Sequence, residues 1–212
     1  LLICKTGFPS LVRQGLTSIS TITLNYCARA YGDAAVAAMS IVNRICFFTF
    51  ATALGIGQFF QPVCAFNYGA KKYERVKKAF WFTLLVGEVF LGTVALAGMP
   101  FAKPLVALFR DDADVVRIGA PALMAQFAAQ VFQPFAVCAN MMFQSVGMTG
   151  TATFLSMLRS GLFFLPLLLV LTACFGLAGV QYSQAAADVL TTAVALPFGI
   201  RFLATLAERK ET

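Results

Sequence analysis

The chain has 212 residues, of which 59% are hydrophobic and 12% are charged, and its formal net charge is +7. Soluble globular proteins carry about 25% charged residues, and the mean hydropathy of +0.81 is too high for a solvated surface. These values exclude a soluble protein and indicate an integral membrane protein. The positive charge is interpreted as membrane anchoring, not nucleic-acid binding, because no nucleic-acid-binding motif accompanies it.

Histidine is absent, and the six Cys residues are scattered through apolar stretches without a CxxC pair. We expect these Cys residues to be small buried hydrophobes, so neither a metal site nor a cofactor is expected. An intramembrane enzyme is disfavoured, because no span contains histidine or a close pair of carboxylates. The chain begins without Met and without a signal peptide, so we expect it to be an interior part of a longer protein.

Six membrane-spanning helices are predicted, because about 20 apolar residues cross the hydrocarbon core. The first is expected to have Pro9 in its first turn, where Pro is tolerated. Asp33 is expected to cap the second helix, and Gly55, Gly57 and Pro62 are expected to kink it. The predicted fold is an all-α integral membrane bundle with six transmembrane helices. The spans are residues 9–30, 34–66, 76–97, 114–146, 152–175 and 180–206.

Positive residues are divided unequally between the two sides of these spans. The side that would hold both chain ends receives 11 of the 16 Lys and Arg residues, the other side receives 4, and Arg44 lies inside the second span. Cytoplasmic loops carry the excess of Lys and Arg, so both ends are expected in the cytoplasm. The 11 are Lys5, Arg13, Lys71, Lys72, Arg75, Lys77, Lys78, Arg159, Arg201, Arg209 and Lys210.

Polar side chains form stripes on three of the predicted helices. The fourth span carries five amides within about 80° of arc. Lipid offers them no hydrogen-bond partner, so this face must turn toward other helices or water. Interhelical hydrogen bonding alone would explain one stripe, whereas three stripes favour a polar cavity between the first, fourth and sixth spans. The substrate-binding candidates are Gln14, Ser18, Thr21, Asn25, Gln130, Gln133, Asn140 and Gln144.

Two carboxylates are predicted near the middle of spans, Asp188 in the sixth and Glu88 in the third. Burial disfavours a charged carboxylate, so either residue could exchange a proton near neutral pH. Asp188 shares a face with other polar groups and is the preferred ion-coupling candidate, with the isolated Glu88 second. Arg159 is expected near the cytoplasmic interface, either snorkelling or ion-paired.

Several motifs together resemble the C-terminal half of multidrug and toxic compound extrusion (MATE) transporters, and most closely the MepA-like bacterial branch. They are GFPS and RQ in the first span, YGDAAVAA after it, and GIGQ, QP and NYGAKK in and after the second. The stretch Phe143–Gly147, Arg159 and the stretch Gly179–Asp188 also fit. The most specific run contains Gln61, Pro62, Asn67, Tyr68, Gly69, Ala70, Lys71 and Lys72.

The resemblance implies a twelve-helix transporter in which two six-helix lobes rock around a central cavity. Such a protein would lie in the bacterial plasma membrane, export amphipathic organic cations in exchange for protons or sodium, and contribute to antibiotic resistance. Residues 1–212 would form the C-terminal lobe, and the missing N-terminal lobe would be its partner. The acidic ion ligands that some members carry on the helices matching the first and fourth spans have no counterpart here.

Two alternatives accompany this interpretation. One is a lipid-linked oligosaccharide flippase of related architecture, in which we would expect more cationic residues inside the cavity to meet pyrophosphate. Only Arg44 is a deep candidate for that role. The other is a fragment that is inactive when isolated.

Overall fold

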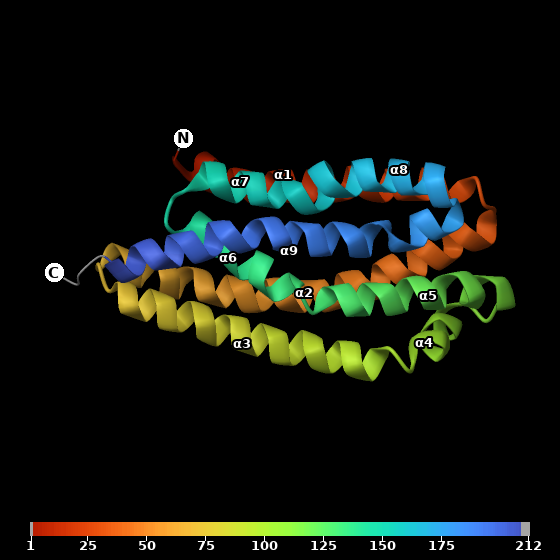
Figure 1. The fold of residues 1–212 in the computed structure, drawn as a ribbon, viewed down its shortest axis with the longest axis horizontal. Coiled ribbons are helices and arrows are strands. Elements are labelled where there is room, and N and C mark those ends of the chain that lie inside the picture. Colours follow the sequence, from red (N-terminus) through yellow and green to blue (C-terminus); the bar gives the residue numbers. More distant parts are fainter. Residues whose placement is uncertain (1, 209–212) are drawn as a thin grey trace.

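The computed structural model describes residues 2–208, with side chains from residue 7 onward except that of residue 207. Every element within these residues is helical, and the long helices run side by side in one elongated bundle (Figure 1). The elements are α1 (Leu2–Arg29), α2 (Asp33–Gly69), α3 (Tyr73–Gly98), α4 (Ala102–Phe109), α5 (Ala113–Gln130), α6 (Gln133–Ser145), α7 (Thr149–Met157), the π-helical segment η1 (Leu158–Phe163), α8 (Phe164–Phe175) and α9 (Leu177–Glu208).

The bundle is built to sit in a membrane. Within residues 2–208, four helices are long and apolar enough to cross one, namely α2, α3, the continuous stretch from α7 to α8, and α9, and the bent pair α5 and α6 makes a fifth. At 28 residues α1 is also long enough, although its polar face leaves it outside this set. Large apolar side chains such as Phe59, which is 83% exposed, cover the outside of the bundle. The chain is therefore a multi-pass membrane protein.

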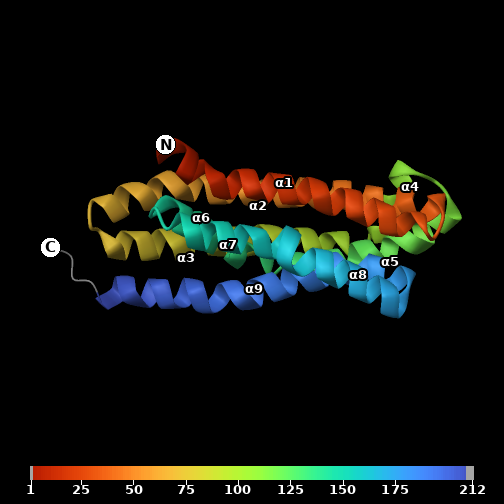
Figure 2. The same cartoon turned by 90° about the horizontal axis from the view of Figure 1, so that it is seen from above.

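The connections between helices gather at two opposite ends. The start of α1, the α2–α3 turn, the α6–α7 turn and the end of α9 lie at one end, and the α1–α2 and α8–α9 turns lie at the other (Figure 1). In the view from above, α1 and α2 run along one side of the bundle and α9 along the other (Figure 2). Connections at two opposite ends of the bundle are what consecutive membrane crossings produce.

Two helix starts differ from their predicted positions. Helix α1 begins at Leu2, so Pro9 lies inside it and not in its first turn. An internal Pro removes one backbone hydrogen bond, which a helix packed on its neighbours can tolerate. Helix α2 begins at Asp33 itself, with Gly32 as its N-cap and no capping bond from a side chain. Within α2, a Cβ on Gly57 would lie 3.1 Å from Val137 Cγ1, so this glycine allows α2 and α6 to pack closely.

The stretch predicted as one helix over residues 114–146 is two helices, α5 and α6, that meet at 52°. Pro134 has no backbone N–H to continue the helical ladder across the junction. The Thr192 hydroxyl of α9 donates to the carbonyl oxygen of Phe132 at 2.9 Å and so satisfies one acceptor at the break. The break therefore has a specific partner on a neighbouring helix, which the sequence of the span alone does not reveal.

A second irregularity is η1, where residues 158–163 form a π-helix. Pro166 follows closely and cannot donate a backbone hydrogen bond into this region. The carbonyl oxygen of Ser160, within this segment, accepts from the Ser20 hydroxyl of α1. Short π segments inside α-helices are rare and are often found at functional sites.

The turn after α2 has the geometry of a Schellman motif. The N–H of Lys72 donates to the carbonyl of Asn67 at 2.8 Å, and the N–H of Lys71 donates to the carbonyl of Tyr68 at 3.0 Å. Gly69 is the last helical residue. The residue in the left-handed region is Lys71, with a φ of 57°.

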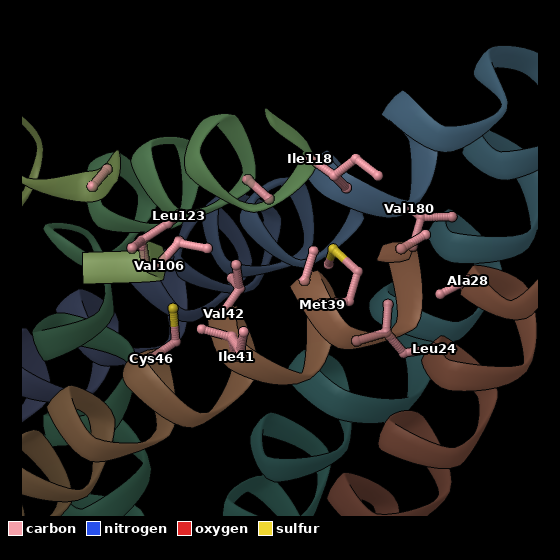
Figure 3. Packing of buried hydrophobic residues seen from close by; sticks show 14 of the residues in the cluster. Leu24, Ala28, Met39, Ile41, Val42, Cys46, Val106, Ile118, Leu123 and Val180 are labelled. Atoms are coloured by element: carbon pink, nitrogen blue, oxygen red, sulfur yellow. The ribbon is translucent and has the colours of Figure 1, made fainter. Parts of the chain in front are cut away.

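Two buried apolar clusters fill the bundle. The first includes Met39, Val106 and Leu123 (Figure 3). The second includes Phe135 and Ala195. On α5, α6 and α9 a layer of buried polar side chains lies between the two clusters, and the candidate site is in this layer. These side chains are Gln130, Gln133, Asp188, Thr191 and Thr192.

Candidate functional site

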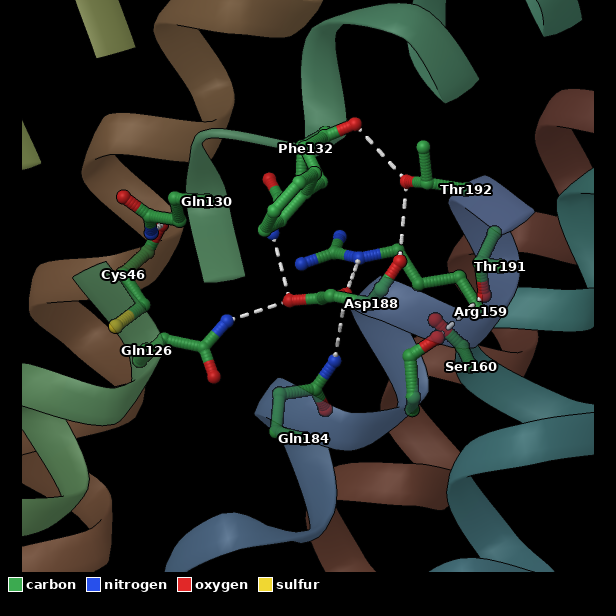
Figure 4. Close-up of polar contacts among 12 residues, drawn as sticks. Cys46, Gln126, Gln130, Phe132, Arg159, Ser160, Gln184, Asp188, Thr191 and Thr192 are labelled. Atoms are coloured by element: carbon green, nitrogen blue, oxygen red, sulfur yellow. Dashed lines mark hydrogen bonds and ion pairs between the residues drawn. The ribbon is translucent and has the colours of Figure 1, made fainter. Parts of the chain in front are cut away.

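The centre of the polar layer is Asp188 of α9, which is 1% exposed. Its Oδ2 accepts from the side-chain amides of Gln126 at 2.5 Å and Gln133 at 2.7 Å. Its Oδ1 accepts from Arg159 Nε at 2.6 Å and from Gln184 Nε2 at 3.2 Å (Figure 4). Four donors and one positive charge are the surroundings that a buried, ionised carboxylate requires.

Arg159 of η1 reaches well into the bundle, whereas it was expected near the cytoplasmic interface. Its side chain is 23% exposed, and its interaction is the ion pair with Asp188, not snorkelling. Its Cζ lies 3.8 Å from the centroid of the Phe50 ring of α2, a cation–π contact. Neither terminal nitrogen is hydrogen-bonded to a residue that the structure describes. One edge of the guanidinium therefore holds Asp188 and the other edge is available.

A cavity of about 90 Å³ adjoins this ion pair, between α1, α2, α5, η1 and α9. A smaller hollow of about 40 Å³ shares part of its lining and extends toward α6. Both are lined by apolar and polar groups, and within the described residues no Asp or Glu lines either one. The residues that line both are Arg13, Phe50, Leu54, Arg159 and Ser160.

The candidates on α1 are only partly at this cavity. Gln14 and Thr21 line it. Ser18 is exposed and donates to the Gln14 carbonyl at 3.2 Å, and Asn25 is partly buried outside the lining. The roles proposed for Ser18 and Asn25 stay predictions without a place in the cavity.

The buried polar edge of α1 lies beside the predicted stripe. Thr17 and Ser20 line the cavity, and Thr17 Oγ1 lies 3.3 Å from the Ser160 hydroxyl of η1. Arg13 also lines it, although it was assigned to the cytoplasmic anchor. Helical periodicity placed the polar face approximately, but the exact side that packs on η1 depends on the π-helical geometry, which the periodicity does not contain.

The five amides of α5 and α6 are all buried, but they serve different partners. Gln126 and Gln133 hold Asp188, as described above. Gln130, 0% exposed, donates to Thr49 Oγ1 at 2.7 Å and lies 3.4 Å from the Cys46 carbonyl of α2. This amide joins α5 to α2 and lines neither hollow. The buried amides are Gln126, Gln130, Gln133, Asn140 and Gln144.

The two amides of α6 near the end of the stripe also bridge helices. Asn140 Nδ2 donates to the Ala152 carbonyl at 2.7 Å and to Ser156 Oγ at 2.9 Å, and Asn140 lines the smaller hollow. Gln144 Nε2 donates to Ser10 Oγ at 3.2 Å, and its Oε1 accepts from Gln61 at 3.1 Å. All five amides of the stripe are thus hydrogen-bonded to other helices, and only Gln126 and Asn140 also line a hollow.

Glu88 of α3 lies apart from this site. It is partly buried, lines neither hollow, and has no hydrogen bond or ion pair among the described residues. Arg44 is exposed and also lines neither hollow, so the prediction that it is the deep cation was wrong. Among the residues that the structure describes, the cations that line the hollows are Arg13 and Arg159. In the described part of the chain, no group of three or more His, Cys, Asp or Glu side chains could hold a metal ion.

The motif residues from Gln61 to Lys72 close one end of the bundle and line neither hollow. Asn67 Nδ2 donates to the Val63 carbonyl at 2.8 Å, and the Tyr68 ring packs edge-on against Tyr73 and beside Phe202 of α9. In the described residues Asn67 to Lys72 shape the α2–α3 turn, while Gln61 bonds α2 to α6.

The chain is similar to known transporters over most of its length. Residues 9–170 match the family model described as MatE. The multidrug export protein MepA of Staphylococcus aureus (strain MSSA476) is 26% identical over 195 residues, which are 92% of this chain and 43% of that protein. MepA of Staphylococcus saprophyticus is 24% identical over 194 residues. The chain thus spans less than half the length of the relatives it matches.

Solved structures show the same arrangement of helices. An outward-facing multidrug resistance MATE family transporter of the MOP superfamily superposes with a TM-score of 0.90 at 22% identity, covering 98% of this chain and 47% of that one. The bent form of the Vibrio cholerae MATE transporter VcmN gives 0.86 at 21% identity, covering 96% and 46%. The match of residues 9–170 to the family model shows that the chain belongs to the MATE family, a family of transporters and not of enzymes.

Proposed function

We propose that this chain forms one lobe of a multidrug exporter that moves amphipathic drugs in exchange for protons or sodium. The observation that carries the proposal is the cavity beside the buried Asp188–Arg159 pair, where a ligand site and an ionisable group adjoin. Membership of the MATE family and the names of the relatives support it.

The cavity walls suit ligands of varied shape. Phe47, Phe50, Leu54 and Phe164 supply apolar surface, and hydroxyl and amide groups supply scattered polar contacts. Apolar contact is not directional, so such a wall tolerates many amphipathic molecules. The amphipathic organic cations that the family resemblance implies remain the proposed substrates, although the described lining offers them no carboxylate.

Asp188 is the proposed ion-coupling residue, with Glu88 as the second candidate. A proton on Asp188 would remove the charge that attracts Arg159 and turn one carboxyl oxygen into a donor. Because four donors already point at this carboxylate, at least one of them would have to leave. Protonation would thus loosen contacts that join α5, α6, η1 and α9, which gives a physical route from ion binding to helix movement.

Alternating access requires a second lobe, so the proposed partner is the missing N-terminal lobe. The excess of Lys and Arg at one end of the bundle supports an orientation with both ends of this chain in the cytoplasm. A chain tested without its partner lobe would be inactive in transport.

One observation favours a second candidate, a lipid-linked oligosaccharide flippase. Arg13 and Arg159 both line the cavity, whereas Arg44 was the one arginine predicted from the sequence for this role. Two guanidinium groups are suited to a pyrophosphate.

The test is ethidium efflux from proteoliposomes that contain the full-length gene product carrying this chain, under an imposed proton or sodium gradient. We expect gradient-driven efflux in the wild type, loss of coupling in Asp188→Asn, and normal coupling in the matched carboxylate variant Glu88→Gln. Unchanged coupled efflux in Asp188→Asn would remove Asp188 from the mechanism. Absence of efflux for any cation tested would contradict drug export and favour the flippase.

A further inference from the structure

Arg13 of α1 is a partly buried cation that has no partner among the residues that the structure describes. Its Nε is shielded from solvent and has no hydrogen bond, and its side chain makes no ion pair with any residue that the structure describes. Arg13 lines both hollows. A charged group in a low-dielectric interior is costly unless it is paired, so an unpaired arginine at a cavity wall indicates that its partner is a ligand.

Arg159 presents a second set of free donors to the same space. Its Nε is taken by Asp188, while its two terminal nitrogens have no hydrogen bond to any described residue. No carboxylate lines either hollow among the described residues. Two guanidiniums and one carboxylate leave the site with one uncompensated positive charge.

We infer that this cavity binds the anionic head group, a carboxylate or a phosphate, of an amphipathic ligand. Arg13 and the free edge of Arg159 would hold the anion, because a planar guanidinium matches the paired oxygens of either group. The apolar body would lie against Phe50 and Leu54, which line both hollows. The inference rests on the proposed function only in that transport brings ligands to this cavity. A zwitterionic drug would place its anionic end here.

Binding of three molecules with the same aromatic body tests this charge preference. The full-length protein in nanodiscs would be titrated with 2-naphthoate, 2-naphthamide and 2-naphthylmethylammonium, with no ion gradient present. We expect 2-naphthoate to bind about tenfold more tightly than the amide, and the ammonium compound to bind most weakly. Equal binding of naphthoate and amide, or tighter binding of the ammonium compound, would overturn the inference.

Variants assign the preference to the cavity. Arg13→Gln is expected to bring the naphthoate-to-amide ratio close to one, while Arg13→Lys retains part of the preference. Arg44→Gln is the matched control, because it removes an exposed arginine outside the cavity and should leave the ratio unchanged. A full preference in folded Arg13→Gln would refute the role of Arg13. Should that variant fail to fold, the wild-type series and Arg13→Lys still decide.

A competition arm identifies the source of the anion. Displacement of 2-naphthoate by farnesyl pyrophosphate at lower concentration than by farnesol would support the anion site and point to a lipid-linked ligand. Displacement by farnesyl pyrophosphate only at the concentration needed for farnesol would contradict recognition of phosphate and restrict the inference to carboxylates. Preferred binding of 2-naphthoate without ethidium efflux would contradict the proposed drug export and still support the anion site. Ethidium efflux without preferred binding of 2-naphthoate would support drug export and contradict the anion site.

Discussion

Two carboxylates lie within apolar helices of this protein, and their surroundings are opposite. Asp188 is almost fully buried and receives donors from α5, α6, η1 and α9. Glu88 is partly buried on α3 and has no partner among the described residues. From the sequence, both carboxylates were predicted to be buried near the middle of a span and were therefore candidates for ion coupling. The difference teaches that the convergence of donors from several helices, not depth alone, distinguishes an organised acidic site.

The largest effect is expected from Asp188→Asn. This change leaves the partly buried Arg159 without its counter-charge and points an amide N–H₂ at two of the four donors. We expect a loss of about 3 kcal/mol in stability, measured as a lower midpoint of thermal unfolding in nanodiscs. An unfolding midpoint equal to that of the wild type would show that the comparison between the two carboxylates is mistaken.

Arg159→Gln is expected to cost somewhat less, about 2 kcal/mol, because the three glutamines still solvate Asp188. The double variant Asp188→Asn/Arg159→Gln should be more stable than the sum of the single losses predicts, since the two residues interact directly. A double-mutant cycle of unfolding midpoints measures this coupling. Strict additivity would mean that the ion pair contributes nothing.

Gln133→Leu replaces the amide with an apolar side chain of similar size and so removes one hydrogen bond to the charged carboxylate. We expect a loss of about 1.5 kcal/mol in stability, because hydrogen bonds to charged groups contribute more than neutral ones. Ser18→Ala is the matched control on an exposed polar residue and should change stability by less than about 0.5 kcal/mol. A larger loss of stability in Ser18→Ala than in Gln133→Leu would contradict this prediction.

Glu88→Gln should have the smallest effect, within about 0.5 kcal/mol of the wild type, because the carboxylate has no partner to lose. Coupled ethidium efflux should also be unchanged. The measurement is the unfolding midpoint together with the efflux rate under a proton gradient. Loss of coupling in this variant would move the ion-coupling role from α9 to α3.

Composition and helical periodicity were sufficient to predict a helical membrane bundle and a buried amide face on residues 126–144. They are properties of each helix alone, so a single sequence contains them. The break at Val131 and Phe132 and the π-helix at Arg159 depend on contacts between helices. The pairing of Arg159 with Asp188 joins residues 29 positions apart and could not be read from either span.

The role assigned to Arg13 depends on where the first helix begins. With the first helix starting at Pro9, Arg13 lay near a membrane edge and was counted as an anchor. Because α1 starts at Leu2, Arg13 is the twelfth residue of that helix and is about three turns inside it. The same residue then becomes a cavity-lining cation.

The order of the Asp188 donors along the chain has a consequence for biosynthesis. Gln126, Gln133 and Arg159 all precede Asp188, which lies on the last helix. When α9 is inserted into the membrane, three of the four donors have already been synthesised. The carboxylate can therefore be hydrogen-bonded as soon as it enters the hydrocarbon. Until then Arg159 lacks its counter-charge. We expect a chain truncated before Leu177 to be recognised by quality-control proteases, and pulse-chase labelling of that truncation would measure its shorter lifetime.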